Sequence, residues 1–284
     1  MIPKGRNALI YETVKLWDKH PEATLTSYVP ENTPELKYTP RRTVLVCPGG
    51  GYHFLSDREA EPIAVQFLQA GFNAFVLRYS IEPEAKDYAP LIEAALAMKY
   101  IRQNAEKYNV DPGKVFVAGF SAGGHLACSL GTLWNIPEVR DAIGVSSGEV
   151  PEGIDRPDGM ILSYPVITAG EKTHKRSIRN VSGHAEPTAE DIEAFSLERH
   201  VDDDTCPAFI WHTFTDATVP VENSLLLASA MAEHKIPFEL HIFPEGKHGL
   251  SLCNEFTCSG KEDNINAHNE CWIELAVKWI KDFK

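Results

Sequence analysis

Residues 114–130 read Lys-Val-Phe-Val-Ala-Gly-Phe-Ser-Ala-Gly-Gly-His-Leu-Ala-Cys-Ser-Leu. The apolar, β-branched run at residues 115–118 predicts a short buried strand. Leu126 and Leu130 then recur at helical spacing. Ser121 stands between these segments, at the centre of a Gly-x-Ser-x-Gly pentapeptide. This order predicts a nucleophile elbow, in which a serine hydroxyl is raised above the end of a strand and the following helix points its N-terminus at it.

The two glycines of the pentapeptide suit so tight a turn. At Gly119 and Gly123 a side chain would collide with the neighbouring backbone, and glycine removes that conflict. A Gly-x-Ser-x-Gly match also occurs by chance, so the interpretation requires more than the pentapeptide. The rest of the chain has to supply a base for Ser121 and a group that binds an oxyanion.

Length and charge restrict the class of protein. The 284 residues favour a single α/β domain over residues 1–284, and a hydrophobic content of 43% is ordinary for a globular protein. The net charge of −13 argues against nucleic acid and anionic membrane surfaces as partners. No apolar run approaches the ~18 residues that span a membrane, and no apolar segment follows the basic residues at the N-terminus. A cytoplasmic location without a signal peptide is therefore expected.

The cysteines do not form a recognisable framework. Six of them in a chain of this length are too few for a disulfide-rich fold, and Cys47 and Cys128 lie in apolar surroundings. Cys253 and Cys258 are too far apart for a Cys-x-x-Cys motif. We expect buried, reduced thiols, with no metal and no cofactor.

Strands and helices alternate along most of the chain. Buried strands are predicted at residues 43–47, 73–79, 159–164, 207–212 and 238–243, and helices at 57–70, 88–107, 221–234 and around Trp272 and Trp279. Two alternating segments, residues 13–17 and 23–29, suggest an antiparallel hairpin at the sheet edge. The alternation predicts an α/β fold with a mostly parallel twisted sheet and helices on both faces.

Residues 166–204 differ in composition from the rest of the chain. They are rich in His, Lys, Arg, Glu and Asp, with little apolar periodicity. We expect an insertion over the active-site mouth, partly helical at residues 188–195, because long segments of this kind are often lids or binding loops. A solvated decoration is the alternative.

A glycine-rich segment follows the strand predicted at residues 43–47 and reads Pro-Gly-Gly-Gly-Tyr-His over residues 48–53. Its spacing matches neither a dinucleotide-binding motif nor a Walker loop. Exposed backbone N–H groups here can face a developing oxyanion, as in the His-Gly-Gly-Gly loop of many esterases. A flexible turn is the alternative. Tyr52 and His53 border the loop. Each can contact the substrate, and ordinary packing is the alternative.

An imidazole has to accept the proton of Ser121, because a serine hydroxyl alone is a poor nucleophile near neutral pH. His248 falls in the loop after the strand at residues 238–243, where it can reach over the sheet. His241 lies within that strand, and His268 lies in or near the final helix. His248 is therefore the predicted base, with a surface histidine as the alternative.

A carboxylate has to orient the imidazole through its second nitrogen. Asp216 follows the strand at residues 207–212 and is the predicted partner. The aspartates at residues 202–204 precede that strand, so they belong at its opposite end as a solvated acidic turn. The order Ser121, Asp216, His248 is that of an α/β-hydrolase.

Four motifs together resemble the small carbohydrate acetyl esterases of the α/β-hydrolase superfamily, which include acetylxylan-type and BD-FAE-like esterases. They are Pro-Gly-Gly-Gly-Tyr (48–52), Gly-Phe-Ser-Ala-Gly-Gly-His-Leu-Ala (119–127), Trp-His-Thr-x-x-Asp-x-x-Val-Pro (211–220) and Phe-Pro-x-Gly-x-His-Gly-Leu (243–250). The resemblance spans residues 40–282. It implies a catalytic triad of Ser121, Asp216 and His248, and an oxyanion hole formed by the amides of Gly50, Gly51 and Ala122.

The resemblance implies a serine carboxylesterase that deacetylates acetylated sugars or xylo-oligosaccharides through an acetyl-serine intermediate. Its partner is then a small ester substrate, an acetylated carbohydrate, with no nucleic acid and no membrane; homo-oligomerisation is left open. Pro48 replaces the histidine of the hormone-sensitive-lipase pattern, which disfavours long-chain substrates. The alternatives are a serine peptidase of the same fold and a non-catalytic binding protein that uses a hydrolase fold.

Overall fold

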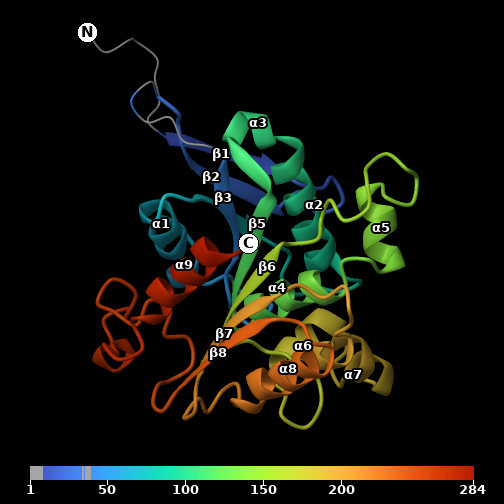
Figure 1. Cartoon of the computed structure of the whole chain (residues 1–284). Coiled ribbons are helices and arrows are strands. Elements are labelled where there is room, and N and C mark those ends of the chain that lie inside the picture. The colour runs from blue at the N-terminus through green and yellow to red at the C-terminus, as the bar shows by residue number, and fades with distance from the viewer. Residues whose placement is uncertain (1–8, 34, 36–39) are drawn as a thin grey trace.

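The computed structural model describes residues 9–33, 35 and 40–284. Residues 1–8, which include the basic N-terminal residues considered for a leader segment, lie outside the described part. An eight-stranded sheet crosses the molecule in the order β1-β2-β4-β3-β5-β6-β7-β8 (Figure 1). The strands are β1 Leu9–Lys15, β2 Thr24–Pro30, β3 Arg41–Cys47, β4 Asn73–Arg78, β5 Val110–Phe120, β6 Gly159–Ser163, β7 Ala208–Thr213 and β8 Phe238–Phe243.

Most strand pairs of this sheet are parallel. Every pair from β4 through β3, β5, β6 and β7 to β8 is parallel, whereas β1 pairs antiparallel with β2 and β2 antiparallel with β4. The hairpin at the sheet edge is confirmed, although β1 begins at Leu9, earlier than predicted. The mostly parallel sheet is confirmed as well.

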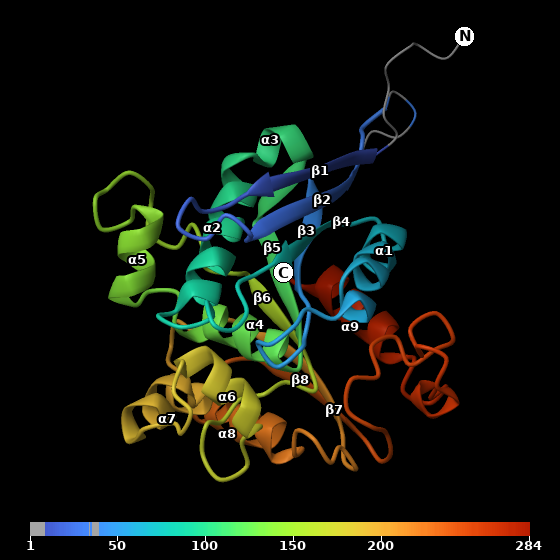
Figure 2. The ribbon, with the colours of Figure 1, turned by 180° about the vertical axis from the view of Figure 1, so that it is seen from behind.

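Helices cover both faces of the sheet, because the central strands bury side chains on both sides. In β5, Val115 and Val117 face one core cluster, while Phe116 and Ala118 face the other. One face carries α1 Glu61–Gln69 and α9 Trp272–Asp282 (Figure 1). The other face carries α2 Ala89–Gln103, α3 Ala105–Tyr108, α4 Ala122–Thr132, α5 Pro137–Ile143, α6 Lys175–Ser182, α7 Ala189–Phe195 and α8 Glu222–Glu233 (Figure 2).

Two predicted helices are interrupted. The helix predicted at residues 57–70 divides into a 3-10 turn, Asp57–Glu59, and α1, which begins with Pro62 in its first turn. Proline lacks the N–H for a helix interior but fits a helix start. The helix predicted at 88–107 divides at Asn104, whose side chain donates to the Tyr100 carbonyl at 2.8 Å.

The segment 166–204 carries α6, α7 and the 3-10 turn Leu197–Arg199. The helix predicted near its end is confirmed as α7, which begins with a capping box between Thr188 and Asp191. Helix α6 was not predicted. Both views place α6 and α7 together, close to α8 (Figures 1 and 2).

The cysteines are free, and four of them are buried: Cys47, Cys128, Cys206 and Cys253. Within the described ranges, no helix is both long and apolar enough to cross a membrane. The cytoplasmic location stays a prediction.

Candidate active site

Three loops from distant parts of the sequence meet at one edge of the sheet. Ser121 follows β5, Asp216 lies in the loop after β7, and His248 lies in the loop after β8. These strands are parallel, so their carboxyl ends lie at the same edge of the sheet, where ligands of open α/β sheets bind.

Ser121 sits in a strained turn between β5 and α4. Its backbone has φ of 55° and ψ of −117°, a conformation that non-glycine residues rarely adopt. The turn leaves no room beside it: a Cβ on Gly119 would lie 2.1 Å from the Gly123 carbonyl oxygen, and one on Gly123 2.2 Å from that of Cys47. This is the elbow geometry that the sequence predicted.

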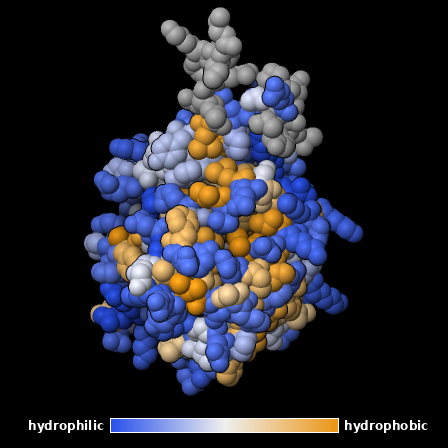
Figure 3. All heavy atoms as spheres, turned by 90° about the vertical axis from the view of Figure 1, so that its left-hand side faces the viewer, coloured by the Kyte–Doolittle hydropathy of each residue, from blue (hydrophilic) through white to orange (hydrophobic). Residues whose placement is uncertain are grey.

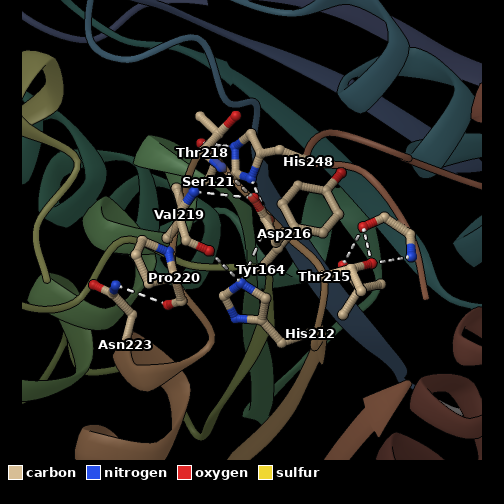
Figure 4. Close-up of polar contacts among 12 residues, drawn as sticks. Ser121, Tyr164, His212, Thr215, Asp216, Thr218, Val219, Pro220, Asn223 and His248 are labelled. Atoms are coloured by element: carbon tan, nitrogen blue, oxygen red, sulfur yellow. Dashed lines mark hydrogen bonds and ion pairs between the residues drawn. The ribbon is translucent and has the colours of Figure 1, made fainter. Parts of the chain in front are cut away.

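Ser121, His248 and Asp216 form a continuous chain of hydrogen bonds (Figure 4). His248 Nε2 lies 2.7 Å from Ser121 Oγ, and His248 Nδ1 lies 2.6 Å from Asp216 Oδ2. The carboxylate only accepts, so Nδ1 carries the proton and Nε2 is left to accept from the serine hydroxyl. Chemically, this arrangement can draw the proton from Ser121 as the serine oxygen attacks an electrophile.

Asp216 is held by more than the imidazole of His248. Its Oδ1 accepts the backbone N–H groups of Thr218 and Val219, each at 2.9 Å (Figure 4). Burial alone would raise the pKa of Asp216. Hydrogen bonds from His212, His248 and the Val219 amide outweigh this and hold the pKa well below its usual value. The carboxylate is therefore charged throughout the neutral range.

His212 supports Asp216 from inside the core and was not predicted as a site residue. Its Nε2 lies 3.0 Å from the Val219 carbonyl oxygen and 3.4 Å from Asp216 Oδ2, while Nδ1 lies 2.8 Å from Ser224 Oγ. Only acceptors surround Nε2, so Nε2 carries the proton. Its place within the motif Trp-His-Thr was the available signal, but the motif does not say where the ring points.

The backbone amides of the glycine loop are candidate donors for an oxyanion. Gly50 and Gly51 have φ of 133° and 66°, in the region of positive φ that favours glycine. Within the described part of the chain, no acceptor contacts the N–H of Gly50, Gly51 or Ala122. The third amide is the first of α4, directly after Ser121. Unpaired donors of this kind can bind a developing negative charge.

A buried carboxylate ties the glycine loop to the histidine loop. Glu59, 3% exposed, accepts the Gly49 N–H at 3.0 Å and the Tyr164 hydroxyl at 2.7 Å. The Tyr164 oxygen in turn accepts the Ser251 N–H at 2.9 Å. The Tyr164 ring packs edge-on against His248, with 5.1 Å between ring centroids. Neither Glu59 nor Tyr164 was predicted as a site residue.

The two aromatic residues at the end of the glycine loop differ in position. Tyr52 is buried, and its hydroxyl lies 3.0 Å from His125 Nδ1, while His125 Nε2 donates to the Phe195 carbonyl at 3.1 Å. Burial lowers the pKa of His125 to about 4, so the imidazole is uncharged near neutral pH and packs as part of the core. The packing alternative therefore fits Tyr52. His53 is exposed and pairs with Glu82, and its contact with substrate stays a prediction.

The segment 166–204 contacts the site through α6. Asn180 donates from its side-chain amide to the Gly51 carbonyl oxygen at 2.7 Å, across 129 positions of sequence. This bond fixes the outer side of the glycine loop. This contact could not be predicted, because an asparagine in a polar helix has no distinguishing sequence pattern.

Other features of the surface lie apart from these residues. A hollow of about 750 Å³ between α1 and α9 contains none of the residues above. On the face of the molecule shown in Figure 3, apolar and polar groups are interspersed. No cluster of three or more His, Cys, Asp or Glu side chains suited to a metal occurs among the described residues.

Comparison with known proteins gives a family match and close relatives. The profile of the BD-FAE family matches residues 28–231. The chain is 45% identical to endo-1,4-beta-xylanase B of Butyrivibrio fibrisolvens, over 78% of this chain and 34% of that protein. It is 31% identical to the acetylxylan esterase of Xylanibacter ruminicola, over 81% of this chain and 44% of that protein. The chain thus spans less than half the length of either relative.

Two solved structures share the fold over almost their full length. One is an α/β-hydrolase enzyme from a Medee basin deep-sea metagenome library, with 34% identity, a TM-score of 0.78 and coverage of 98% of this chain and 99% of that one. The other is an acetyl ester-xyloside bifunctional hydrolase from Caldicellulosiruptor lactoaceticus, with 33% identity, a TM-score of 0.79 and coverage of 95% of each chain. The predicted α/β-hydrolase fold is confirmed.

Proposed function

This chain belongs to the BD-FAE family of α/β-hydrolases, and we propose that it is a serine carboxylesterase that removes acetyl groups from acetylated sugars or xylo-oligosaccharides. One observation carries the proposal. It is the pair of hydrogen bonds, 2.7 and 2.6 Å long, that connects the hydroxyl of Ser121 to the carboxylate of Asp216 through His248.

The proposed reaction runs in two halves. Ser121 Oγ attacks the ester carbonyl while His248 Nε2 takes its proton, and the imidazolium then gives that proton to the departing alcohol oxygen. Acetyl-serine remains. A water molecule loses a proton to His248 and attacks the acetyl carbon; acetate leaves, and the serine oxygen recovers its proton. Asp216 holds Nδ1–H throughout, and the reaction consumes only ester and water.

The oxyanion that forms in each half needs hydrogen-bond donors. We propose the amides of Gly50, Gly51 and Ala122, which have no acceptor within the described residues. Removal of one such donor typically raises the barrier by roughly 3 kcal/mol. The three lie on fixed backbone, so they require no reorganisation during the reaction.

The choice of an acetylated carbohydrate rests on the relatives. One is called an acetylxylan esterase and a solved neighbour an acetyl ester-xyloside hydrolase. The chain spans only part of the acetylxylan esterase, so the substrate of this chain is inferred from similarity and is tested directly below.

The first experiment replaces the proposed nucleophile. Ser121→Ala removes one oxygen, and the strained turn suits alanine no less than serine, so the thermal midpoint should stay within a few degrees. Hydrolysis of p-nitrophenyl acetate should fall by at least ~10³-fold. Undiminished turnover in this variant would refute the assignment of Ser121.

Further substrates separate the rival functions. A serine peptidase of this fold would cleave peptide nitroanilides faster than acyl esters, whereas we expect short acyl esters to be preferred. A non-catalytic binding protein would fail to react with a fluorophosphonate probe, and the proposed enzyme should be labelled stoichiometrically at Ser121.

A further inference from the structure

We propose that His174 is a specificity residue for the alcohol part of the ester, and that its Nε2 hydrogen-bonds a hydroxyl group of a sugar leaving group. This inference rests on the proposed esterase function and assigns a role to the segment 166–204, which supplies His174 immediately before α6.

The position of His174 is the first argument. A Cβ placed on Gly51 would lie 3.8 Å from His174 Cε1 and 3.8 Å from Ser177 Oγ, so both side chains border the glycine loop. The side-chain amide of Asn180 donates a hydrogen bond to the carbonyl oxygen of the same glycine. Residues 174, 177 and 180 are three apart, so they lie on one side of the helix. The imidazole is thereby brought next to an amide that we assign to the oxyanion hole.

The orientation of the ring is the second argument. His174 Nδ1 lies 2.8 Å from the hydroxyl of Ser177, which is fully buried and therefore a fixed anchor. Within the described residues, Nε2 has no hydrogen-bond partner, and it is not one of the buried unpaired polar atoms. One nitrogen thus positions the ring, while the other faces solvent and is available to a ligand.

The charge state of the ring is the third argument. Burial lowers the pKa of His174, and the positive charge of Arg176 lowers it further, whereas Asp216 opposes the shift. A neutral imidazole offers one donor or one acceptor at Nε2, depending on the tautomer, and a sugar hydroxyl can match either.

These positions correspond to the alcohol side of the reaction. His248 Nε2 has to give its proton to the departing oxygen, so the alcohol part of the ester lies beside His248. His174 borders Gly51, and a Cβ placed on Gly49 of the same loop would lie 3.2 Å from Ser121 Cβ, so this loop connects His174 with the nucleophile. A hydroxylated alcohol placed between them meets Nε2 of His174, whereas a nitrophenyl leaving group offers no hydroxyl to bind.

The experiment compares two substrates on matched variants. In the His174→Ala enzyme, kcat/KM for an acetylated xylo-oligosaccharide should fall about tenfold, the effect of one hydrogen bond. The value for p-nitrophenyl acetate should stay within about twofold of the unsubstituted enzyme. The His174→Gln enzyme should recover part of the loss, because the glutamine amide reaches the position of Nε2.

Two controls separate this role from a structural one. His184→Ala removes a histidine of the same segment whose partner is Asp191 rather than Ser177, and it should change kcat/KM for neither substrate. Asn180→Ala should lower kcat for both substrates alike, because it loosens the glycine loop. An equal loss on both substrates in His174→Ala, or no loss on the sugar ester, would overturn the role of His174.

The proposed function fails separately from this inference. If the unsubstituted enzyme hydrolyses neither ester, the esterase proposal itself is wrong. If it hydrolyses p-nitrophenyl acetate but no acetylated sugar, the esterase chemistry stands, while the sugar substrate and the role of His174 are both refuted. If it hydrolyses both and His174→Ala is selective, both proposals are supported.

Discussion

Glu59 is the single side chain through which two loops of the site are joined. Its carboxylate accepts hydrogen bonds from the Gly49 N–H of one loop and from the Tyr164 hydroxyl. The Tyr164 oxygen in turn accepts the Ser251 N–H of the other loop. Within the described residues, no Lys or Arg forms an ion pair with Glu59, so its role is to accept hydrogen bonds in a buried place. We therefore regard Glu59 as a positioning residue.

The Glu59→Gln substitution tests that role. The amide keeps one acceptor but points an NH2 group at either Gly49 N–H or the Tyr164 hydroxyl, so one loop has to shift. We expect kcat for p-nitrophenyl acetate to fall by about 10- to 100-fold with little change in KM, because small displacements of catalytic groups carry a cost of that order.

The matched control is Glu61→Gln, two residues along, where the carboxylate pairs with Arg78 near the surface. It should leave kcat within about twofold. A Glu59→Gln enzyme with a lower thermal midpoint but an unchanged kcat would mean that Glu59 serves stability alone.

At the scale of single residues, the sequence predicted the three side chains of the proposed triad but none of the residues that hold them in place. Ser121, Asp216 and His248 each follow a recognisable strand, so chain order could bring them together. Glu59 stands in Ser-Asp-Arg-Glu-Ala-Glu, where nothing distinguishes it from its neighbours. Its partners lie 10 and 105 positions away, and only the folded chain selects them.

Among the elements, the turn between β5 and α4 is the most tightly packed part of the site. Gly123, the second residue of α4, packs against the end of β3. A Cβ at this position would lie 2.2 Å from the Cys47 carbonyl oxygen and 2.4 Å from the Pro48 carbonyl oxygen. Both neighbours are backbone atoms, which cannot rotate away. The helix would have to move, and Ser121 would move with it.

The Gly123→Ala substitution should therefore lower the free energy of unfolding by about 2 kcal/mol or more and reduce kcat at least tenfold. Urea unfolding and p-nitrophenyl acetate turnover measure the two effects. Gly113→Ala is the control on the same strand, where the nearest atom to a Cβ is 3.7 Å away, and it should cost less than about 1 kcal/mol. Equal effects at both positions would contradict the packing argument.

Helices and strands could be predicted from the sequence where the apolar periodicity was strong, and were missed or shortened where it was weak. The strand at residues 238–243 coincides with β8, whereas β5 runs from Val110 to Phe120 and the pattern marked only its buried middle. Helix α6 has two buried apolar side chains, Ile178 and Val181, in a run of charged and polar residues. Two apolar positions are too few to predict a helix, and they are recognised as one helical face only because both side chains pack into the core.

For the whole molecule, the sequence predicted the alternation of strands and helices and a mostly parallel sheet, but not the order of the strands. Strand β4 lies between β2 and β3, so consecutive strands are not always neighbours. The interior also holds a titratable group that no pattern indicated. Glu93 in α2 is fully buried, where its carboxyl group accepts both the N–H and the hydroxyl of Ser80.

The buried carboxyl of Glu93 should make the stability of the molecule depend on pH. Burial raises its pKa to about 7 from 4.5, although the hydrogen bonds from Ser80 oppose the rise. Between these values the unfolded chain releases the proton while the folded chain keeps it, so a rise in pH favours unfolding. The protonated carboxyl contributes fully to the free energy of unfolding below pH 4.5, and this contribution is lost as the pH rises to 7. For the difference between the two pKa values the loss is roughly 3 kcal/mol.

The Glu93→Gln substitution removes this titration. Urea unfolding at pH 5, 6, 7 and 8 should show the variant gaining stability relative to the unsubstituted protein by roughly 3 kcal/mol across that range. The exposed Glu106, replaced in the same way, should give a constant difference. Both substitutions remove one carboxyl group from the unfolded chain, so only the burial of the Glu93 carboxyl in the folded protein can produce the divergence. Parallel profiles for the two variants would mean that Glu93 is ionised in the folded protein at neutral pH and that Ser80 outweighs burial.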